Sequence, residues 1–490
     1  MNNLRWFIFF LLAAGIASCN RDYSSSWLKY IDSTGTYSSP RVVDLNKDNV
    51  KDIIIGAGGK EEVYSDTAVL AIDGATGNIL WAIPGSNQYV GSAQFKDITH
   101  DGIPDVFIGG RWSQLSAVNG ATGKIIWTFY PQRTKPDGSD GGWYNFTTPQ
   151  FIYDQDGDGF EDLLVANGGD ARAEAGDPNR PIGRLLVLSS ASGKILRNVQ
   201  VPDGKETYMS VVSEFSNDTL TNVYFGTGGE TLPGKLYRIS LFDLLQGNMS
   251  KAKVLASSDT KGFIASPVLV DINHDGERDI IVNAVDGRML AIDGATDSML
   301  WQVQFPGTEA YTIPATGRFT DDSIPDFFGN FAIGSFPVLN WSVRFMVNGA
   351  TGKIMYQDTI PAFQYASATA ADINADGYDE VIINQSALKR RQFDDVYYSY
   401  LLAFDFKNQQ RISLGDTIQA TNLASTPWIG DLDNNHQLDI IYSAVKYHDV
   451  KFDLQKPLGL FIGRRETKIQ ISKPIKWGAY MGSNYNCIVN

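Results

Sequence analysis

The chain has 490 residues, with 41 Lys and Arg against 55 Asp and Glu, which gives a formal net charge of −14 at pH 7. An acidic chain of this kind lacks the clustered basic surface of a nucleic-acid-binding protein. Its two cysteines, Cys19 and Cys487, exclude a disulfide scaffold, and we expect Cys487 to be a structural residue.

The N-terminus has the layout of an export signal. An apolar run covers residues 6–16, which is too short to span a bilayer as a helix, and it leads into Ile16-Ala17-Ser18-Cys19. This ending resembles a bacterial lipoprotein box. The resemblance implies a signal peptide over 1–18, acylation of Cys19 and a lipidated tether over 19–28. The protein would then meet the membrane only through its N-terminal lipid, and an ordinary signal peptide is the alternative.

Oxygen-bearing side chains recur in nine-residue loops along the chain. In the most regular loop, 154–162, positions 1, 3, 5 and 9 are all aspartate and position 6 is a glycine. Alternate side chains of a tight loop can converge on one point, and Ca²⁺ takes six to eight oxygen ligands of this kind. Six loops keep the pattern: Asp44, Asn46, Asp48 and Asp52; Asp97, Thr99, Asp101 and Asp105; Asp154, Asp156, Asp158 and Asp162; Asp271, Asn273, Asp275 and Asp279; Asp372, Asn374, Asp376 and Glu380; Asp431, Asp433, Asn435 and Asp439.

Two further stretches, 214–222 and 318–326, look like degraded copies of this loop. Arg318 stands where the first aspartate belongs, so we expect no Ca²⁺ there, and occupancy of 214–222 stays open. With both included, successive loops start 47 to 60 residues apart. Such near-constant spacing indicates a repeat architecture rather than several unrelated domains.

Each repeat also predicts four short strands. An apolar run such as Ile53-Ile54-Ile55 leaves the loop and reads as a buried strand. A second motif then follows, in which an Asp/Asn-Gly turn joins two strands as a hairpin and a closing Trp or Tyr is placed to pack on the next unit. This motif covers 71–81 (AIDGATGNILW), 117–127, 291–301 and 346–356, with a weaker copy at 189–194.

Four antiparallel strands per unit predict an all-β fold, a single closed β-propeller over residues 29–490 made of about eight repeats. We expect eight four-stranded blades, and seven is the alternative because two loops are degraded. A lone blade cannot bury both of its faces, so the ring must close. We expect the last unit, ending near Trp477, to pack against the first, which starts near Trp27.

The loops resemble the FG-GAP or VCBS-type repeats of integrin α propellers. The hairpins resemble the tryptophan-docking repeats of quinoprotein-type propellers and BamB-like lipoproteins. Together the motifs cover most of residues 30–445. The first resemblance implies that the loop side chains are Ca²⁺ ligands, joined by a backbone carbonyl near position 7. We expect about six structural sites, because the loop carboxylates would repel one another without a cation.

Irregular connections between the repeats supply a candidate partner surface. If the repeats align as expected, these connections gather at one end of the ring, where loops commonly carry recognition. The alternative is that they are only long solvated loops. The candidates for binding a partner or ligand are Arg111, Trp112, Trp143, Tyr144, Asp170, Arg172, Arg180 and Glu230.

No nucleophile or acid–base pair can be assigned, so the sequence favours a non-enzymatic binding or scaffold protein of the bacterial cell envelope. Its partner would be an envelope protein or a glycan. A carbohydrate-active enzyme or glycan-binding propeller is one alternative. A quinoprotein-type dehydrogenase is another, although the vicinal cysteine pair of many such alcohol dehydrogenases is absent. Asn20, in place of an aspartate after Cys19, favours the outer membrane, with a periplasmic or a surface-facing orientation open.

Overall fold

The computed structural model describes residues 26–60, 63–129, 145–170, 173–174, 176–216, 220–362, 364–390, 395–447 and 457–489. The predicted signal peptide and Cys19 lie outside these ranges, as do residues 19–25 of the predicted tether. Among the described residues, no helix is long and apolar enough to cross a membrane.

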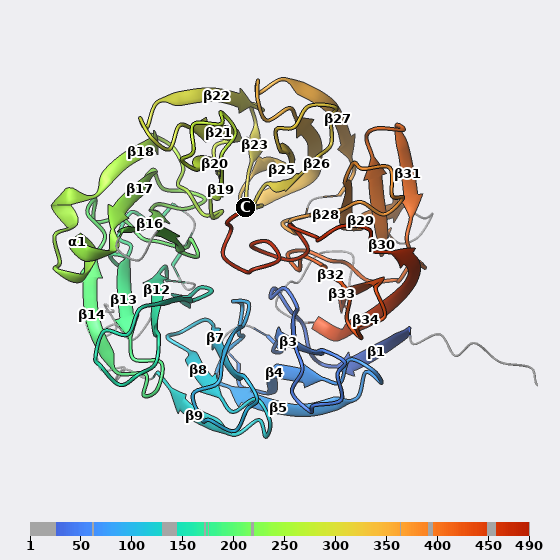
Figure 1. Ribbon diagram of the computed structural model, residues 1–490, viewed down its shortest axis with the longest axis horizontal. Coiled ribbons are helices and arrows are strands. Elements are labelled where there is room, and N and C mark those ends of the chain that lie inside the picture. The colour runs from blue at the N-terminus through green and yellow to red at the C-terminus, as the bar shows by residue number, and fades with distance from the viewer. Residues whose placement is uncertain are drawn as a thin grey trace, which may run out of the picture.

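Eight antiparallel sheets surround a central axis and form a closed propeller, which confirms the all-β prediction and the count of eight blades (Figure 1). Blades 3 and 6 each carry one extra short strand. From the axis outward, blades 1 to 4 contain β2 (Arg41–Val43), β3 (Asp52–Gly56), β4 (Ser65–Ile72) and β5 (Ile79–Gly85); β6 (Gln94–Lys96), β7 (Asp105–Gly109), β8 (Leu115–Val118) and β9 (Ile125–Thr128); β10 (Asn145–Phe146), β11 (Gln150–Ile152), β12 (Asp162–Gly168), β13 (Arg184–Leu188) and β14 (Ile195–Gln200); β15 (Val212–Ser216), β16 (Leu220–Gly226), β17 (Gly234–Ser240) and β18 (Lys253–Ser258).

The second half of the chain repeats this order. Blades 5 to 8 contain β19 (Val268–Val270), β20 (Asp279–Ala284), β21 (Arg288–Ile292) and β22 (Met299–Gln304); β23 (Thr308–Glu309), β24 (Ala315–Gly317), β25 (Asp326–Ser335), β26 (Val338–Val347) and β27 (Ile354–Ile360); β28 (Thr369–Ala371), β29 (Glu380–Arg390), β30 (Asp395–Asp405) and β31 (Gln410–Ser413); β32 (Trp428–Gly430), β33 (Gln437–Tyr447), β34 (Pro457–Gln470) and β1 (Trp27–Asp32). A short α-helix, α1 (Leu241–Leu245), and a 3₁₀ turn, η1 (Met249–Lys251), separate β17 from β18.

Burial follows the position of a strand in its blade. The second strands β3, β12 and β20 are buried at every residue, because neighbouring blades cover both of their faces. This explains why their sequences are continuous apolar runs. The outermost strand β5 instead alternates between buried and exposed residues, which is the pattern of a strand with one solvated face.

The ring closes by sharing one sheet between the two ends of the chain. Strand β1 pairs antiparallel with β34, in a register that runs from Trp27 opposite Arg464 to Asp32 opposite Gly459. The sequence predicted that the last unit packs against a first unit starting near Trp27. In fact Trp27 belongs to the last blade itself. Backbone hydrogen bonds between β1 and β34 therefore close the ring, in addition to side-chain packing between blades.

Tryptophans of the outermost strands dock four of the blades on the next one, in the way that the hairpin motif predicted. The indole N–H of Trp81 donates to Gly120 O at 2.7 Å, and Trp301 donates to Gly349 O at the same distance. Gly123, which follows in the same turn with φ at +69°, is a glycine for two reasons: its backbone is left-handed, and a Cβ there would lie 2.6 Å from the Trp81 ring. Trp27 repeats the contact across the closure, donating to Gly74 O at 3.0 Å.

A second set of contacts joins the blades close to the axis, and we call it the hydroxyl ring. A Ser or Thr just before the innermost strand of one blade bonds the backbone of the neighbouring blade. These bonds join seven of the eight blade junctions in sequence. They run from Ile313 N to Ser367 Oγ (3.0 Å), Ser367 N to Thr426 Oγ1 (3.2 Å), Thr426 N to Ser39 Oγ (2.9 Å), Ser39 N to Ser92 Oγ (3.3 Å), Ser92 N to Thr148 Oγ1 (3.0 Å), Thr148 N to Ser210 Oγ (3.2 Å) and Ser266 Oγ to Ser210 O (2.6 Å).

The C-terminal residues 471–489 cross the centre of the ring (Figure 1). Cys487, predicted to be structural, is buried and free there, and its carbonyl accepts a bond from Leu269 N at 2.9 Å. The fully buried guanidinium of Arg41 lies 4.2 Å from the centre of the Tyr485 ring, and burial lowers the pKa of Arg41 to about 10. The segment thus occupies part of the space that the eight innermost strands leave around the axis.

We predict that Thr426→Val destabilises the protein by about 1–3 kcal/mol, because it leaves the buried N–H of Ser367 without its acceptor while keeping the side-chain volume. Urea unfolding measures the change. Thr426→Ser keeps the oxygen and serves as the control. Equal stability of the two variants would contradict a holding role for the hydroxyl ring.

Candidate functional site

The two ends of the ring carry different chemistry. Because strands alternate in direction, the β2–β3 loop and the β4–β5 hairpin of blade 1 lie at one end, and the β3–β4 and β5–β6 connections lie at the other. We call the first end, which carries the loops predicted to bind Ca²⁺, the aspartate face. We call the end formed by the β3–β4 and β5–β6 connections and their counterparts the cavity face.

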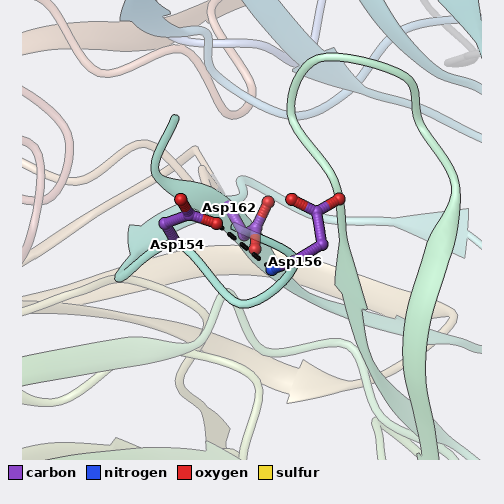
Figure 2. A group of neighbouring side chains, drawn as sticks. All are labelled: Asp154, Asp156 and Asp162. Atoms are coloured by element: carbon purple, nitrogen blue, oxygen red, sulfur yellow. Dashed lines mark hydrogen bonds between the residues drawn. The ribbon is translucent and has the colours of Figure 1, made fainter. Parts of the chain in front are cut away.

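The loop at 154–162 shows how the aspartate face is built. Asp154 Oδ1 accepts from Gly157 N at 2.7 Å, and its Oδ2 accepts from Gly159 N at 2.8 Å. These bonds wrap the loop around the first carboxylate and bring Asp154, Asp156 and Asp162 together (Figure 2). The first aspartates of the loops at 44, 97 and 271 accept the same pair of bonds.

The ninth residue of each loop has a structural task of its own. Asp52 is fully buried and accepts from Leu45 N at 2.8 Å and from Gly74 N at 3.0 Å, so it ties the loop to the hairpin of the same blade. Asp326 makes the same two bonds in the degraded loop that begins with Arg318. Burial raises the pKa of both carboxyls to about 6. The aspartate at position 9 therefore has a structural role, because it accepts bonds from backbone N–H groups whether or not a metal is bound.

The hairpin turns add carboxylates that the sequence reasoning missed. Asp73 accepts from Asn46 Nδ2 at 3.1 Å, and Asp293 accepts from Asn273 Nδ2 at 3.0 Å. Asp405 accepts from Asn374 Nδ2 at 3.3 Å. Asp73 and Asp293 open Asp-Gly turns that were visible as a motif, whereas Asp405 lies in a turn without that motif. The approach of these side chains to the loop of their own blade was not predicted.

The structure brings three groups of carboxylates close enough to share a hard cation. One oxygen from each residue lies within 4.8 Å of the others in Asp154, Asp156 and Asp162; in Asp376, Glu380 and Asp405; and in Asp431, Asp433 and Asp439. Three or more oxygens at such spacing suit Ca²⁺. At the second loop Asp372 Oδ1 is also buried without a hydrogen-bond partner.

The loop at 431–439 differs, because Arg464 reaches into it from β34. Its Nη2 lies 2.7 Å from Asp433 Oδ2 and its Nε lies 2.8 Å from Asp439 Oδ1, with the arginine side chain 1% exposed. A buried guanidinium that already neutralises two of the four predicted ligands repels a divalent cation. Arg464 therefore competes with Ca²⁺ for this loop, and a Ca²⁺ site here stays a prediction, as it does at the other five loops.

The degraded loops also pair with protein groups. The guanidinium of Arg318 lies 4.7 Å from the centre of the Tyr378 ring. At 214–222, β15 and β16 pair from Glu214 opposite Asn222 to Ser216 opposite Leu220, and Glu214 forms an ion pair with Arg278 at 3.1 Å. Asp218 lies outside the described residues.

The cavity face holds a cavity of about 560 Å³ on the axis. All eight blades contribute to its wall, and Tyr480 of the C-terminal segment also lines it. Four of the predicted partner residues meet there, namely Arg111, Asp170, Arg180 and Glu230. Trp112 lies beside Arg111 but not in the wall, and Trp143, Tyr144 and Arg172 lie outside the described residues.

Buried carboxylates behind this wall were not predicted from the sequence. The side chain of Glu206 is 2% exposed, lies 3.6 Å from Arg180 Nη1 and accepts from Tyr208 Oη at 3.0 Å. Burial raises the pKa of Glu206 to about 7, partly offset by Arg180 and Tyr208. Glu309 pairs with Lys261 and accepts from Phe336 N at 3.0 Å, which holds Phe336 at the cavity.

Comparisons with known proteins give the fold and leave the activity open. No family model matches the chain. Protein FAM234B of mouse is 22% identical over 410 residues and that of human 23% over 411, and each match covers 75% of this chain. The chain spans about 60% of the length of these curated relatives.

Among solved structures, a quinohemoprotein alcohol dehydrogenase from Pseudomonas putida HK5 has a TM-score of 0.56 at 10% identity, covering 92% of this chain and 79% of that one. A europium-containing methanol dehydrogenase has a TM-score of 0.52 at 10% identity, covering 91% and 94%. At this identity the likeness shows a shared fold and nothing of the chemistry.

We predict that Arg464→Met destabilises the protein by about 3–5 kcal/mol in chelator, because Asp439 is left buried without its counter-charge. Urea unfolding measures the loss. Arg278→Met, which removes a guanidinium that is 29% exposed, is the control and should lose less. If Asp433→Asn lowered the number of bound Ca²⁺ ions by one, the loop at 431–439 would bind Ca²⁺ despite its ion pairs with Arg464.

We predict that Glu206→Gln stabilises the protein above pH 7. The pKa of Glu206 is raised from 4.5 to about 7 on folding, so the folded state binds the proton more tightly and wild-type stability falls as pH rises through this window. The variant should gain about 3 kcal/mol at pH 8, with the difference vanishing towards pH 4.5. Thermal melts across pH 4.5–8, with exposed Glu161→Gln as the control, test this. A less stable variant at pH 8 would show that the ion pair with Arg180 outweighs the cost of burial.

Proposed function

We propose that the chain is a lipid-anchored, calcium-stabilised propeller that acts as a non-enzymatic binding or scaffold protein of the bacterial cell envelope. It presents the cavity face to an envelope protein or a glycan. The observation that carries the proposal is the meeting of Arg111, Asp170, Arg180 and Glu230 at one axial cavity. Loops from three different blades supply these side chains, which suits recognition at the end of a rigid ring.

The wall of the cavity supports binding more than catalysis. Among the described residues that line it, none is histidine or cysteine. The two carboxylates buried behind it are engaged, Glu206 with Arg180 and Tyr208, and Glu309 with Lys261 and Phe336 N. Such pairing fixes the shape of a binding site, whereas a general base has to be free to reach the substrate.

The N-terminal sequence supports the proposed location. The lipoprotein-like ending at Cys19 would tether the ring through lipid, with the outer membrane favoured by Asn20. The FG-GAP-like loops at 44, 97, 154, 271 and 372 would hold the proposed structural Ca²⁺ through carboxylate and amide oxygens. When bound, Ca²⁺ would neutralise the crowded carboxylates of each loop.

A carbohydrate-active enzyme is the second candidate. Glu206, with its pKa near 7, and Tyr208 are hydrogen-bonded beside the cavity, and a carboxyl poised near neutral pH can exchange a proton with a substrate. A quinoprotein-type dehydrogenase is a weaker candidate, because it has only the likeness in fold.

We predict that chelation lowers the melting temperature, with about 2.7 kcal/mol lost per site held at a hundredfold excess over Kd. Asp158→Asn removes a ligand at position 5 of an intact loop and should reduce the Ca²⁺-dependent part of the stability. Asp322→Asn changes the same position of the degraded loop behind Arg318 and should leave that part unchanged. If chelator left the melting temperature unchanged, the calcium proposal would be wrong.

The binding role is tested by purifying the lipidated protein from its own membranes in Ca²⁺ buffer and identifying what accompanies it in stoichiometric amount. Asp170→Asn and Glu230→Gln should release the partner. Lys124→Ala, in a hairpin of the aspartate face, is the control and should retain it. A solitary protein, or a partner lost only with Lys124→Ala, would contradict a partner at the cavity face.

A further inference from the structure

We infer that the axial cavity binds an uncharged sugar residue, held at the end of a glycan. This inference rests on the proposed binding function and names its ligand class. The wall supplies three things that such a ligand needs: aromatic faces, a balanced set of charges and a layer of hydroxyl donors.

The aromatic faces come from one repeated position. The residue two places before each member of the hydroxyl ring points to the axis in most blades, and in four blades it is a tyrosine of the cavity wall: Tyr37, Tyr208, Tyr311 and Tyr365. The rings of Tyr311 and Tyr365 lie 4.4 Å apart at 53°, so two of these tyrosines form one continuous wall. A tyrosine offers an apolar ring and a polar tip, which matches the C–H face and hydroxyl edge of a sugar.

The wall carries charges of both signs. Arg111 and Arg180 line it together with Asp170 and Glu230, and directly behind it Glu206 pairs with Arg180 while Glu309 pairs with Lys261. A phosphate would meet two carboxylates, and an ammonium group would meet two guanidinium groups. Tyrosine cages for quaternary ammonium ions work through the negative faces of the rings, and neighbouring arginines oppose that attraction. An uncharged ligand with many donors and acceptors can use both signs of charge at once.

The hydroxyl ring forms part of the same wall. Ser39 Oγ accepts from Thr426 N, and Ser92 Oγ accepts from Ser39 N, so each oxygen is fixed in place by the neighbouring blade. A serine hydroxyl keeps its proton when its oxygen accepts a bond. Both serines line the cavity, so their protons can be donated to a ligand hydroxyl. The bonds that hold the blades together thereby pre-orient donors for the ligand, which lowers the entropic cost of binding.

The volume is also suitable. About 560 Å³ lies within the range of small-molecule sites, which is roughly 300–1,000 Å³. Tyr480 lines the cavity, and its C-terminal segment crosses the centre of the ring, so we expect a ligand to enter from the cavity face and to end against this segment. A chain end fits this shape better than the middle of a polymer that has to pass through.

The test uses the full-length lipidated protein in detergent with Ca²⁺. Equilibrium binding is measured against a panel of neutral mono- and oligosaccharides, inorganic phosphate and tetramethylammonium. We expect a neutral saccharide to saturate at one site. Tyr365→Ala should weaken binding at least tenfold, whereas Tyr365→Phe, which keeps the ring, should weaken it less. Tyr64→Ala removes a tyrosine that is 63% exposed and outside the cavity wall, and it should leave the affinity unchanged.

Several results would overturn the inference. One is saturation by phosphate or tetramethylammonium alone, lost in Glu230→Gln or Arg111→Ala. Another is saccharide binding that Tyr365→Ala leaves intact in a protein whose melting temperature is unchanged. If no saccharide binds while a protein co-purifies and is released by Glu230→Gln, the glycan inference falls and the proposed binding role stands. If no saccharide binds and no protein co-purifies, both the glycan inference and the proposed binding role are wrong.

Discussion

Every blade of this ring needs a neighbouring blade on both of its faces. The contacts that hold neighbouring blades together lie at two distances from the axis. Near the axis, the hydroxyl ring joins the blades through side-chain oxygens that accept backbone N–H groups. Near the rim, tryptophans such as Trp81 and Trp301 donate to a turn of the next blade. Strand β1 then completes blade 8 beside β34. Neither contact is large, but the hydroxyl ring joins seven of the eight junctions and the tryptophans reinforce three of these and join the eighth, so each blade is held on both of its sides.

Most of this fold could be predicted from the sequence, because its signals are local and repeated. The aspartate loops, the Asp/Asn-Gly hairpins and the closing tryptophans each fall within about a dozen residues. The partners in the hydroxyl ring and in the closure lie in different repeats. Ser39 bonds Thr426 from the far end of the chain, and only the circular arrangement brings them together. For the same reason, Trp27 was placed in the first unit rather than in the last.

The sites likewise contain features that local spacing predicts and features that form only when distant repeats come together. Spacing within a loop predicts which carboxylates converge, but Arg464 comes from a strand 25 residues beyond Asp439 and carries no motif. Alignment of the repeats brought Arg111, Asp170, Arg180 and Glu230 to the same end of the ring. The four tyrosines of the cavity wall and the buried Glu206 carry no motif, so they were not predicted as site residues. Their importance comes from facing an axis that exists only after eight blades have closed.

The position of β1 determines where the closed ring would yield to a pulling force. A force applied at the N-terminus acts first on this six-residue strand, whose residues pair with β34 from Trp27 to Asp32. The Trp27 indole, bonded to Gly74 of blade 1, is the first anchor that such a load meets. Tension on the chain therefore falls on the seam of the ring, and peeling β1 away would open blade 8 before any other blade. The seam is thus the element that would limit how much pull the folded ring can bear.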